Sequence, residues 1–272
     1  MCATCGCGTT DHVISGITDH SHNHPGTHNH ELHEHSHATH PDIHDDPHSQ
    51  HKTVVEVEED ILYQNNLLAA RNRGYFEAKN ILAINLVSSP GSGKTTLLER
   101  TLNELRSQLN FLVIEGDQQT SYDAERIRAT GTKAAQINTG NGCHLDAHMI
   151  LHALQGMKPE ENSVLFIENV GNLVCPAMFD LGESERVVIM SVTEGDDKPA
   201  KYPHMFATST LCVINKTDLL PYVSFDLQKA KEYLHRVNPN LAVIEASCTN
   251  GQGLEHWYDW LRFKRTHEPI LL

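Results

Sequence analysis

The sequence lacks long apolar stretches and has little positive charge. Its uninterrupted apolar runs stay below about ten residues, whereas a membrane-spanning helix needs about 20. Lys and Arg total 21 against 35 Asp and Glu, which gives a formal net charge of -14. Nonspecific binding to a nucleic-acid backbone requires a basic surface. We therefore expect no membrane and no nucleic acid as a partner.

Cysteine is also scarce, and its seven copies are clustered rather than evenly spread. No charged segment followed by an apolar core resembles a signal peptide. Disulfide frameworks belong to oxidising compartments. These features predict a cytoplasmic protein with reduced thiols.

Residues 1–51 differ in composition from the rest of the chain. They carry 13 of the 20 histidines, seven acidic residues and no Lys or Arg. Their few aliphatic side chains cannot form a core, which predicts a disordered, metal-binding tail. We expect residues 52–79 to form a leading helix, interrupted at Gly74, and residues 80–272 to form one globular domain.

Short apolar runs alternate with amphipathic stretches through that domain. Such an order predicts an α/β fold with a doubly wound, mostly parallel sheet that binds its ligand at the carboxyl ends of the strands. The expected strands are 81–87, 111–114, 164–167, 187–192, 211–214 and 241–244. The expected helices are 95–109, 122–130, 145–154, 225–237 and 254–264.

Residues 88–96, with the sequence SSPGSGKTT, directly follow the first apolar run and open a helix. This context is typical of a Walker A phosphate loop, in which Lys94 reaches the outer phosphates and Thr95 binds Mg2+. Ser88 stands where the general pattern has glycine, so the match is a variant. A plain Gly/Ser turn between strand and helix is the alternative. The residues assigned to nucleotide binding are Gly91, Ser92, Gly93, Lys94, Thr95 and Thr96.

Two carboxylates follow predicted strands at positions suited to a magnesium site. Asp117 comes after the run 111–114, and Glu168 ends the run 164–167, with Gly171 three residues later. A carboxylate at a strand end can hold Mg2+ or orient the attacking water. Each alone could be a solvated loop residue. Together with Lys94 they are the predicted catalytic groups.

An Asn215-Lys216-Thr217-Asp218 loop follows the run 211–214. The carboxylate of Asp218 can accept hydrogen bonds from both N1 and N2 of guanine, whereas adenine would leave it unpaired. This predicts GTP as the nucleotide. Ser247 follows the next strand and can complete the base pocket, although an ordinary turn is the alternative.

The first residues form a cluster of soft ligands. Cys2, Cys5 and Cys7 lie within six residues, and thiolates bind zinc, nickel or copper(I). The histidines that follow form a weak multivalent site. Unrelated cysteines in a tail are the alternative.

A second metal site is predicted inside the domain. Cys143 and His144 stand near the expected start of a helix that places His148 and His152 on one face. Cys175 follows Glu168 by seven residues, in the loop expected to sense the terminal phosphate. The predicted ligands are Cys143, His144, His148 and Cys175. A pair of ordinary helix-face histidines is the alternative for His148 and His152.

Taken together, these motifs resemble the HypB family over essentially the whole chain. The carriers of the resemblance are the Cys2-x-x-Cys5-Gly6-Cys7 start, the His-rich tail, the SSPGSGKTT loop, Cys143-His144, the segment ENVGNLVCP at 168–176 and Asn215-Lys216-Thr217-Asp218. The resemblance implies a metal-dependent, dimeric P-loop GTPase with GTP, Mg2+, Ni2+ and Zn2+ as ligands. It also implies two partners, a HypA-type nickel chaperone and the precursor of a nickel–iron hydrogenase large subunit.

Two rival functions share some of these features. A urease-type nickel GTPase would share the phosphate loop and the base-reading loop, but not the Cys2, Cys5, Cys7 start or the Cys143-His144 pair with Cys175. A metal buffer would use the tail for storage and carry an inert GTPase fold. Turnover of GTP separates the buffer from both GTPases.

Overall fold

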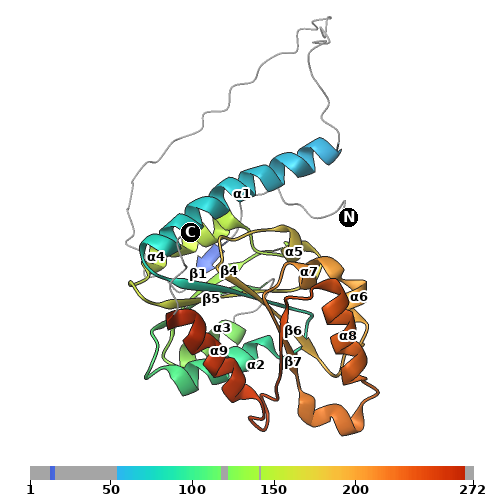
Figure 1. Cartoon of the computed structure of the whole chain (residues 1–272). Coiled ribbons are helices and arrows are strands. Elements are labelled where there is room, and N and C mark those ends of the chain that lie inside the picture. Colours follow the sequence, from blue (N-terminus) through green and yellow to red (C-terminus); the bar gives the residue numbers. More distant parts are fainter. Residues whose placement is uncertain (1–12, 16–53, 118–121, 141, 267–272) are drawn as a thin grey trace, which may run out of the picture.

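The computed structural model describes residues 13–15, 54–117, 122–140 and 142–266. In this part of the chain an eight-stranded sheet has the strand order β1-β4-β3-β5-β2-β6-β7-β8, with helices on both faces (Figure 1). Strands β2 to β8 pair in parallel, and β1 pairs antiparallel with β4 at the edge. The prediction of a doubly wound, mostly parallel sheet is therefore confirmed.

The sheet strands and helices alternate along the chain. The strands are β1 (Val13–Ser15), β2 (Leu82–Ser88), β3 (Phe111–Asp117), β4 (Lys133–Asn138), β5 (Val164–Gly171), β6 (Glu185–Ser191), β7 (Leu211–Asn215) and β8 (Ala242–Glu245). The helices are α1 (Val54–Ala78), α2 (Lys94–Leu105), α3 (Tyr122–Ala129), α4 (Ala147–Met157), α5 (Cys175–Met178), α6 (Lys198–Lys201), α7 (Pro203–Ala207), the 3-10 helix η1 (Thr217–Tyr222), α8 (Leu227–Val237) and α9 (Leu254–Thr266).

Alternate residues of the central strands enter separate cores on the two faces, as the period of two in a strand requires. On β2, Ile84 and Leu86 pack with α2, α3 and α9, whereas Ala83 packs with α1 and α4 on the opposite face. Helices α5, α7 and α8 extend that opposite face over β6 and β7. The central strands are thus buried on both sides, which explains why they read as continuous apolar runs.

Strand β4 was missed by the sequence pattern. Its sequence, KAAQIN, contains a central glutamine and two alanines in place of branched apolar residues. It is held by parallel pairing with β3, so tertiary context rather than local composition makes it a strand.

Helix α1 runs through Gly74 without a break, so the expected interruption was wrong. A glycine inside a helix costs about 1 kcal/mol relative to alanine, and packing can exceed that cost. Asn72, which is fully buried, donates to the carbonyl oxygens of Ala147 (2.9 Å) and Leu181 (3.1 Å). Phe76 is buried against the sheet. These contacts fix α1 on both sides of Gly74.

Most of the predicted tail, with its expected disorder, lies outside the described residues. Its described part is β1, where Val13 pairs with Asn138 and Ser15 with Gln136. Among the helices that the structure describes, none combines the length and apolar character needed to cross a bilayer.

Candidate functional site

The phosphate loop joins β2 to α2 at the carboxyl edge of the sheet. Gly91 and Gly93 have φ values of 74° and 93°, in the left-handed region that favours glycine. Ser88 is not among the residues with positive φ, which explains why a serine is accepted at that position of the loop. Lys94 and its two following threonines form the first turn of α2. They line a cavity of ≈ 530 Å³.

The base-reading loop is bonded directly to the phosphate loop. Asn215 donates from Nδ2 to the carbonyl oxygen of Ser92 at 2.9 Å, and Lys216 donates from Nζ to that of Gly91 at 2.6 Å. A Cβ atom on Gly93 would lie 2.4 Å from Nδ2 of Asn215. A larger residue at Gly93 would therefore separate the two loops.

Asp218 is oriented by Ser247, the residue that the sequence analysis assigned with it to the predicted base pocket. The Ser247 hydroxyl donates to Oδ1 of Asp218 at 2.5 Å and accepts from the amides of Thr249 and Asn250, both at 3.2 Å. The serine is fully buried. One carboxylate oxygen of Asp218 is thus fixed by the loop after β8.

Glu168 reaches the start of α2 from the neighbouring strand β5. Its Oε1 accepts a hydrogen bond from the Thr95 hydroxyl at 2.6 Å and lies 3.9 Å from Nζ of Lys94. Its Oε2 is buried without a hydrogen-bond partner among the described residues. Burial raises the pKa of Glu168. Asp117, at the end of β3, lines the same cavity.

Glu115 is a site residue that the sequence reasoning missed. It stands opposite Glu168 in the register of β3 and β5, is 2% exposed and lines the nucleotide cavity. Burial first, and then the charge of Glu168, raise the pKa of Glu115 to about 8. A glutamate inside an apolar strand was the available signal, because carboxylates are rarely buried without a partner.

These carboxylates fit a divalent cation. Oε2 of Glu115 and Oε2 of Glu168 are both buried without hydrogen-bond partners in the described part of the chain. Hard cations such as Mg2+ take carboxylate and hydroxyl oxygens. The Thr95 hydroxyl and the Asp117 carboxylate line the same cavity and complete an oxygen donor set.

Cys143, His144 and Cys175 come together, with one ligand atom from each lying within 4.8 Å of the others. Sγ of Cys143 is 3.8 Å from Nδ1 of His144, close to the separation of about 3.5 Å between tetrahedral ligands. His144 is buried and its ring lies against that of Phe179, with the centroids 3.9 Å apart and the planes tilted by 32°. Burial lowers the pKa of His144, which favours the neutral ring that binds metals.

His148 lies apart from this group. Helix α4 begins at Ala147 with Asp146 as its N-cap, so Cys143 and His144 belong to the preceding loop rather than to the start of the helix. His148 is exposed and pairs with His152. The cluster has three described ligands, not four.

The remaining cysteines divide into two groups. Cys212 and Cys248 are buried, and burial raises the pKa of both thiols, that of Cys248 to about 11. Protonated thiols in a core are poor ligands. Cys2, Cys5 and Cys7 lie outside the described residues.

One segment, β5 and the loop after it, contacts both sites. A Cβ atom on Gly171 would lie 3.2 Å from Pro90 of the phosphate loop, so this stretch runs closely along that loop. Nδ2 of Asn172 donates to the carbonyl oxygen of Cys143 at 3.2 Å. Cys175 then begins α5. Gly171, beside the phosphate loop, precedes Cys175 of the candidate metal cluster by four residues.

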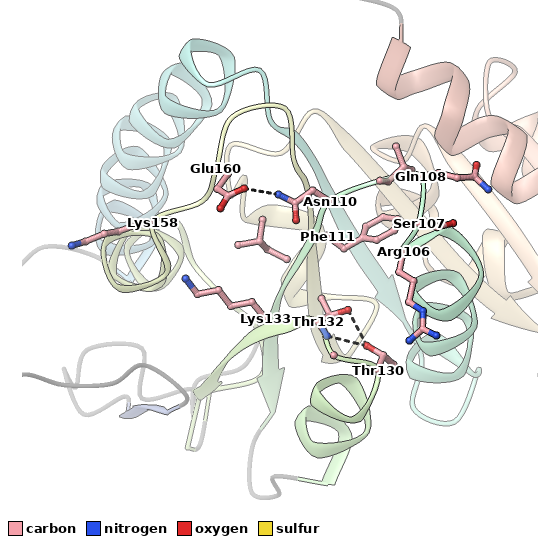
Figure 2. A pocket seen from close by; sticks show the side chains of 13 residues that line it. Arg106, Ser107, Gln108, Asn110, Phe111, Thr130, Thr132, Lys133, Lys158 and Glu160 are labelled. Carbon is pink, nitrogen blue, oxygen red and sulfur yellow. Dashed lines mark hydrogen bonds between the residues drawn. The ribbon is translucent and has the colours of Figure 1, made fainter.

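A larger cavity of ≈ 630 Å³ lies elsewhere, at the amino ends of β3 and β4 (Figure 2). Arg106, Lys133 and Lys158 lie on its rim together with Glu160, which accepts a hydrogen bond from Asn110 at 3.2 Å. None of the predicted site residues lines it. The size of a cavity therefore does not identify the nucleotide site in this fold.

The chain matches known proteins over its globular part. The family profile of the CobW/HypB/UreG nucleotide-binding domain matches residues 82–245. The hydrogenase maturation factor HypB of Escherichia coli is 56% identical over 219 residues, which are 80% of this chain and 76% of that protein. That of Cupriavidus necator is 44% identical over 96% of this chain and 88% of its own length.

Two solved structures share the fold. The HypB crystal structure from Archaeoglobus fulgidus has a TM-score of 0.71 at 43% identity and is matched over its whole length by 75% of this chain. The HypB structure from Helicobacter pylori in complex with nickel has a TM-score of 0.69 at 37% identity, again matched over its whole length, by 76% of this chain.

Proposed function

This chain belongs to the CobW/HypB/UreG family, as a hydrogenase maturation factor of the HypB type, and we propose that it is a GTPase whose nucleotide state controls nickel binding. Its proposed substrate is GTP with Mg2+. Its proposed cargo is Ni2+, intended for the large-subunit precursor of a nickel–iron hydrogenase. Proposed partners are a HypA-type nickel chaperone and a second copy of the chain, in the cytoplasm.

The choice of GTP is supported by the way Asp218 is held. Ser247 occupies one of its oxygens at 2.5 Å and fixes the carboxylate plane, which suits a base with two adjacent N–H donors. Guanine offers these donors at N1 and N2. Adenine would leave the carboxylate unpaired, and that costs about 1–3 kcal/mol for a desolvated polar group.

Hydrolysis is assigned to groups around the outer phosphates. Lys94 stabilises the charge that develops on the transferred phosphoryl group. Thr95, Asp117 and Glu168 would hold Mg2+, which supplies further positive charge there when bound. Glu168, 3% exposed and touching both Lys94 and Thr95, is the carboxylate best placed to respond to loss of the terminal phosphate.

Cys143, His144 and Cys175 are the proposed ligands for Ni2+, with Zn2+ as the competing ion. Three protein ligands leave a further coordination position for water or for a group from a second subunit. The N-terminal Cys2, Cys5 and Cys7 are proposed as a separate, tighter site. The histidines of the same N-terminal tail are proposed to bind additional Ni2+ ions weakly.

The observation that carries this proposal is the continuity of one segment between the two sites. Glu168 contacts Thr95, Asn172 binds the Cys143 carbonyl, and Cys175 is itself a ligand in the cluster. Switch segments of other nucleotide hydrolases move when the terminal phosphate leaves. Movement of this segment would change the separation of Cys175 from Cys143.

The test measures nucleotide affinity with and without Ni2+, because linkage makes the coupling reciprocal. A fluorescent nonhydrolysable GTP analogue is titrated into the full chain and into the double variant Cys143→Ser, Cys175→Ser. We expect Ni2+ to tighten the analogue by roughly 5–150-fold in the wild type, the range for allosteric coupling, and not in the variant. Both proteins carry the N-terminal tail, so Ni2+ binding by the tail contributes equally to the two titrations. Equal effects of Ni2+ in both, or GTP turnover that is absent altogether, would favour a metal buffer.

A further inference from the structure

Helix α1 is bonded to both of the segments that carry the proposed metal ligands. Cys143 and His144 lead into α4, which begins at Ala147. Cys175 begins α5 and is followed five residues later by Asp180. Side chains of α1 reach the backbone of each segment at these points. The position of α1 therefore bears on the distance between the ligands.

Two asparagines of α1 make these contacts. Asn65 accepts a hydrogen bond from the amide of Ala147 at 2.9 Å and donates to the carbonyl oxygen of Asp180 at 2.8 Å. Asn72 donates to the carbonyl oxygens of Ala147 at 2.9 Å and Leu181 at 3.1 Å. Residues seven apart lie on one face of a helix, about two turns from each other. Each asparagine thus joins the same two segments.

These hydrogen bonds are buried, and close packing does not replace them. The two asparagines are 6% and 0% exposed, so a bond that breaks there is not exchanged for one to water. Asn65 lines a cavity of ≈ 300 Å³ at its end of the contact. Arg73 also pairs with Asp180, but both side chains are partly exposed, and such a pair contributes little. The asparagines therefore fix the two segments relative to each other.

We propose that Asn65 and Asn72 are positioning residues for the metal cluster, and that α1 sets the separation between the Cys143-His144 loop and Cys175. The ligand atoms of the cluster lie within 4.8 Å of one another without a metal ion. Segments that are free to move must be ordered when the metal binds, and the lost conformational entropy weakens binding. The inference rests on the proposed function in taking these three side chains as the Ni2+ ligands.

Variants of the asparagines test this without changing a ligand. Asn72→Ala removes two of the hydrogen bonds, whereas Asn65→Asp keeps the acceptor for Ala147 and loses the donor to Asp180. Alkylation of Cys143 in the full chain, read by mass spectrometry against free Ni2+ concentration, reports the cluster separately from the tail. We expect Asn72→Ala to weaken Ni2+ binding by about 10- to 100-fold, the range for groups that orient metal ligands, and Asn65→Asp to weaken it less.

A matched control and a double-variant cycle separate positioning from general stability. Phe76→Leu removes buried packing from the same helix, keeps both asparagines, and should shift the Ni2+ curve by less than about twofold, because metal affinity does not follow unfolding free energy while the folded state dominates. In Cys175→Ser the two segments no longer share a metal ion. Adding Asn72→Ala to that variant should therefore change protection of Cys143 by less than about twofold.

The inference is overturned if Asn72→Ala and Asn65→Asp both bind Ni2+ as the wild type does, or if Phe76→Leu weakens binding as much as they do. It is also overturned if Asn72→Ala has its full effect in the Cys175→Ser background. Absence of Ni2+ protection at Cys143 in the wild type would instead show that the proposed ligands are wrong, and the inference would fall with them. Normal wild-type protection with unchanged variants refutes the positioning role alone.

Discussion

The nucleotide site and the internal metal cluster share the carboxyl edge of the sheet, yet they are built differently. Around the nucleotide cavity, hydrogen bonds between side chains and loops fix the site. Thr95 donates to Glu168, and Asn215 donates to a carbonyl oxygen of the phosphate loop. The proposed metal ligands come from a loop and from a four-residue helix, and both cysteines are half-buried. One site is preorganised before its ligand arrives. The metal cluster depends on the relative position of the loop that carries Cys143 and His144 and the segment that carries Cys175. The second of these segments begins in the nucleotide site, at Glu168.

The largest effect is expected from removing the charge at the phosphates. Lys94→Ala should lower GTP hydrolysis by about 10³-fold, because Lys94 stabilises charge that develops only in the transition state. Phosphate release measures this, and the Ni2+ affinity of the nucleotide-free cluster should stay unchanged. Lys231→Ala removes a partly exposed lysine that pairs with Glu245, away from the nucleotide cavity, and serves as the matched control. Undiminished turnover in Lys94→Ala would exclude the assigned mechanism.

The buried carboxyl group of Glu115 should make the stability of the nucleotide site depend on pH. Its pKa of about 8, against an ordinary value of 4.5, means that the folded protein keeps a proton that the unfolded chain releases. The unfolding free energy should therefore fall as pH rises from about 4.5 to 8, by about 5 kcal/mol for this group, of which about 3 kcal/mol falls between pH 6 and 8, and level off above that window.

The test is urea unfolding of the nucleotide-free chain with EDTA, at pH 6 and pH 8.5. Glu115→Gln should flatten most of that decline, while the exposed Glu161→Gln should retain it. A decline of the same size in Glu115→Gln would mean that other groups, such as Glu168, cause it.

A substitution in the metal cluster should weaken Ni2+ binding and leave GDP binding unchanged. Cys175→Ser removes one of three ligands, and we expect Ni2+ to bind the cluster about 10²-fold more weakly, at the upper end of what even outer-shell losses cost. Alkylation of Cys143, followed by mass spectrometry against Ni2+ concentration, reports this site without interference from the tail. Cys212→Ala changes a buried core thiol instead and should not shift the curve. A loss of GDP affinity in Cys175→Ser would show that the two sites are not separable.

The smallest effect is expected from the hydrogen bonds by which α1 supports the start of α4, next to the metal cluster. Asn72→Ala removes two buried hydrogen bonds that tie α1 to the start of α4 and to Leu181. We expect a loss of about 1–3 kcal/mol in unfolding free energy, the cost of buried acceptors left unpaired. Asn66→Ala, at an exposed position of the same helix, should change it by less than about 0.5 kcal/mol. Equal losses would mean that α1 contributes by helix propensity alone.

The sequence by itself determined most of the strands and longer helices and the two nucleotide motifs, because both are local. Apolar runs define buried strands whatever their neighbours, and the glycines of the phosphate loop act through their own backbone angles. The same locality explains the failures. Strand β4 has no apolar run, and Gly74 interrupts α1 only if propensity is counted without the packing of Asn72 and Phe76.

Only the tertiary structure decided which distant residues meet. Strand order places Glu115 beside Glu168, and the cap at Asp146 separates His148 from Cys143 and His144. Helix spacing alone had grouped these last three residues. The approach of Cys175 to Cys143 and His144 follows from side-chain positions. Those positions depend on packing between elements far apart in the chain, and a pattern within one element carries no information about them.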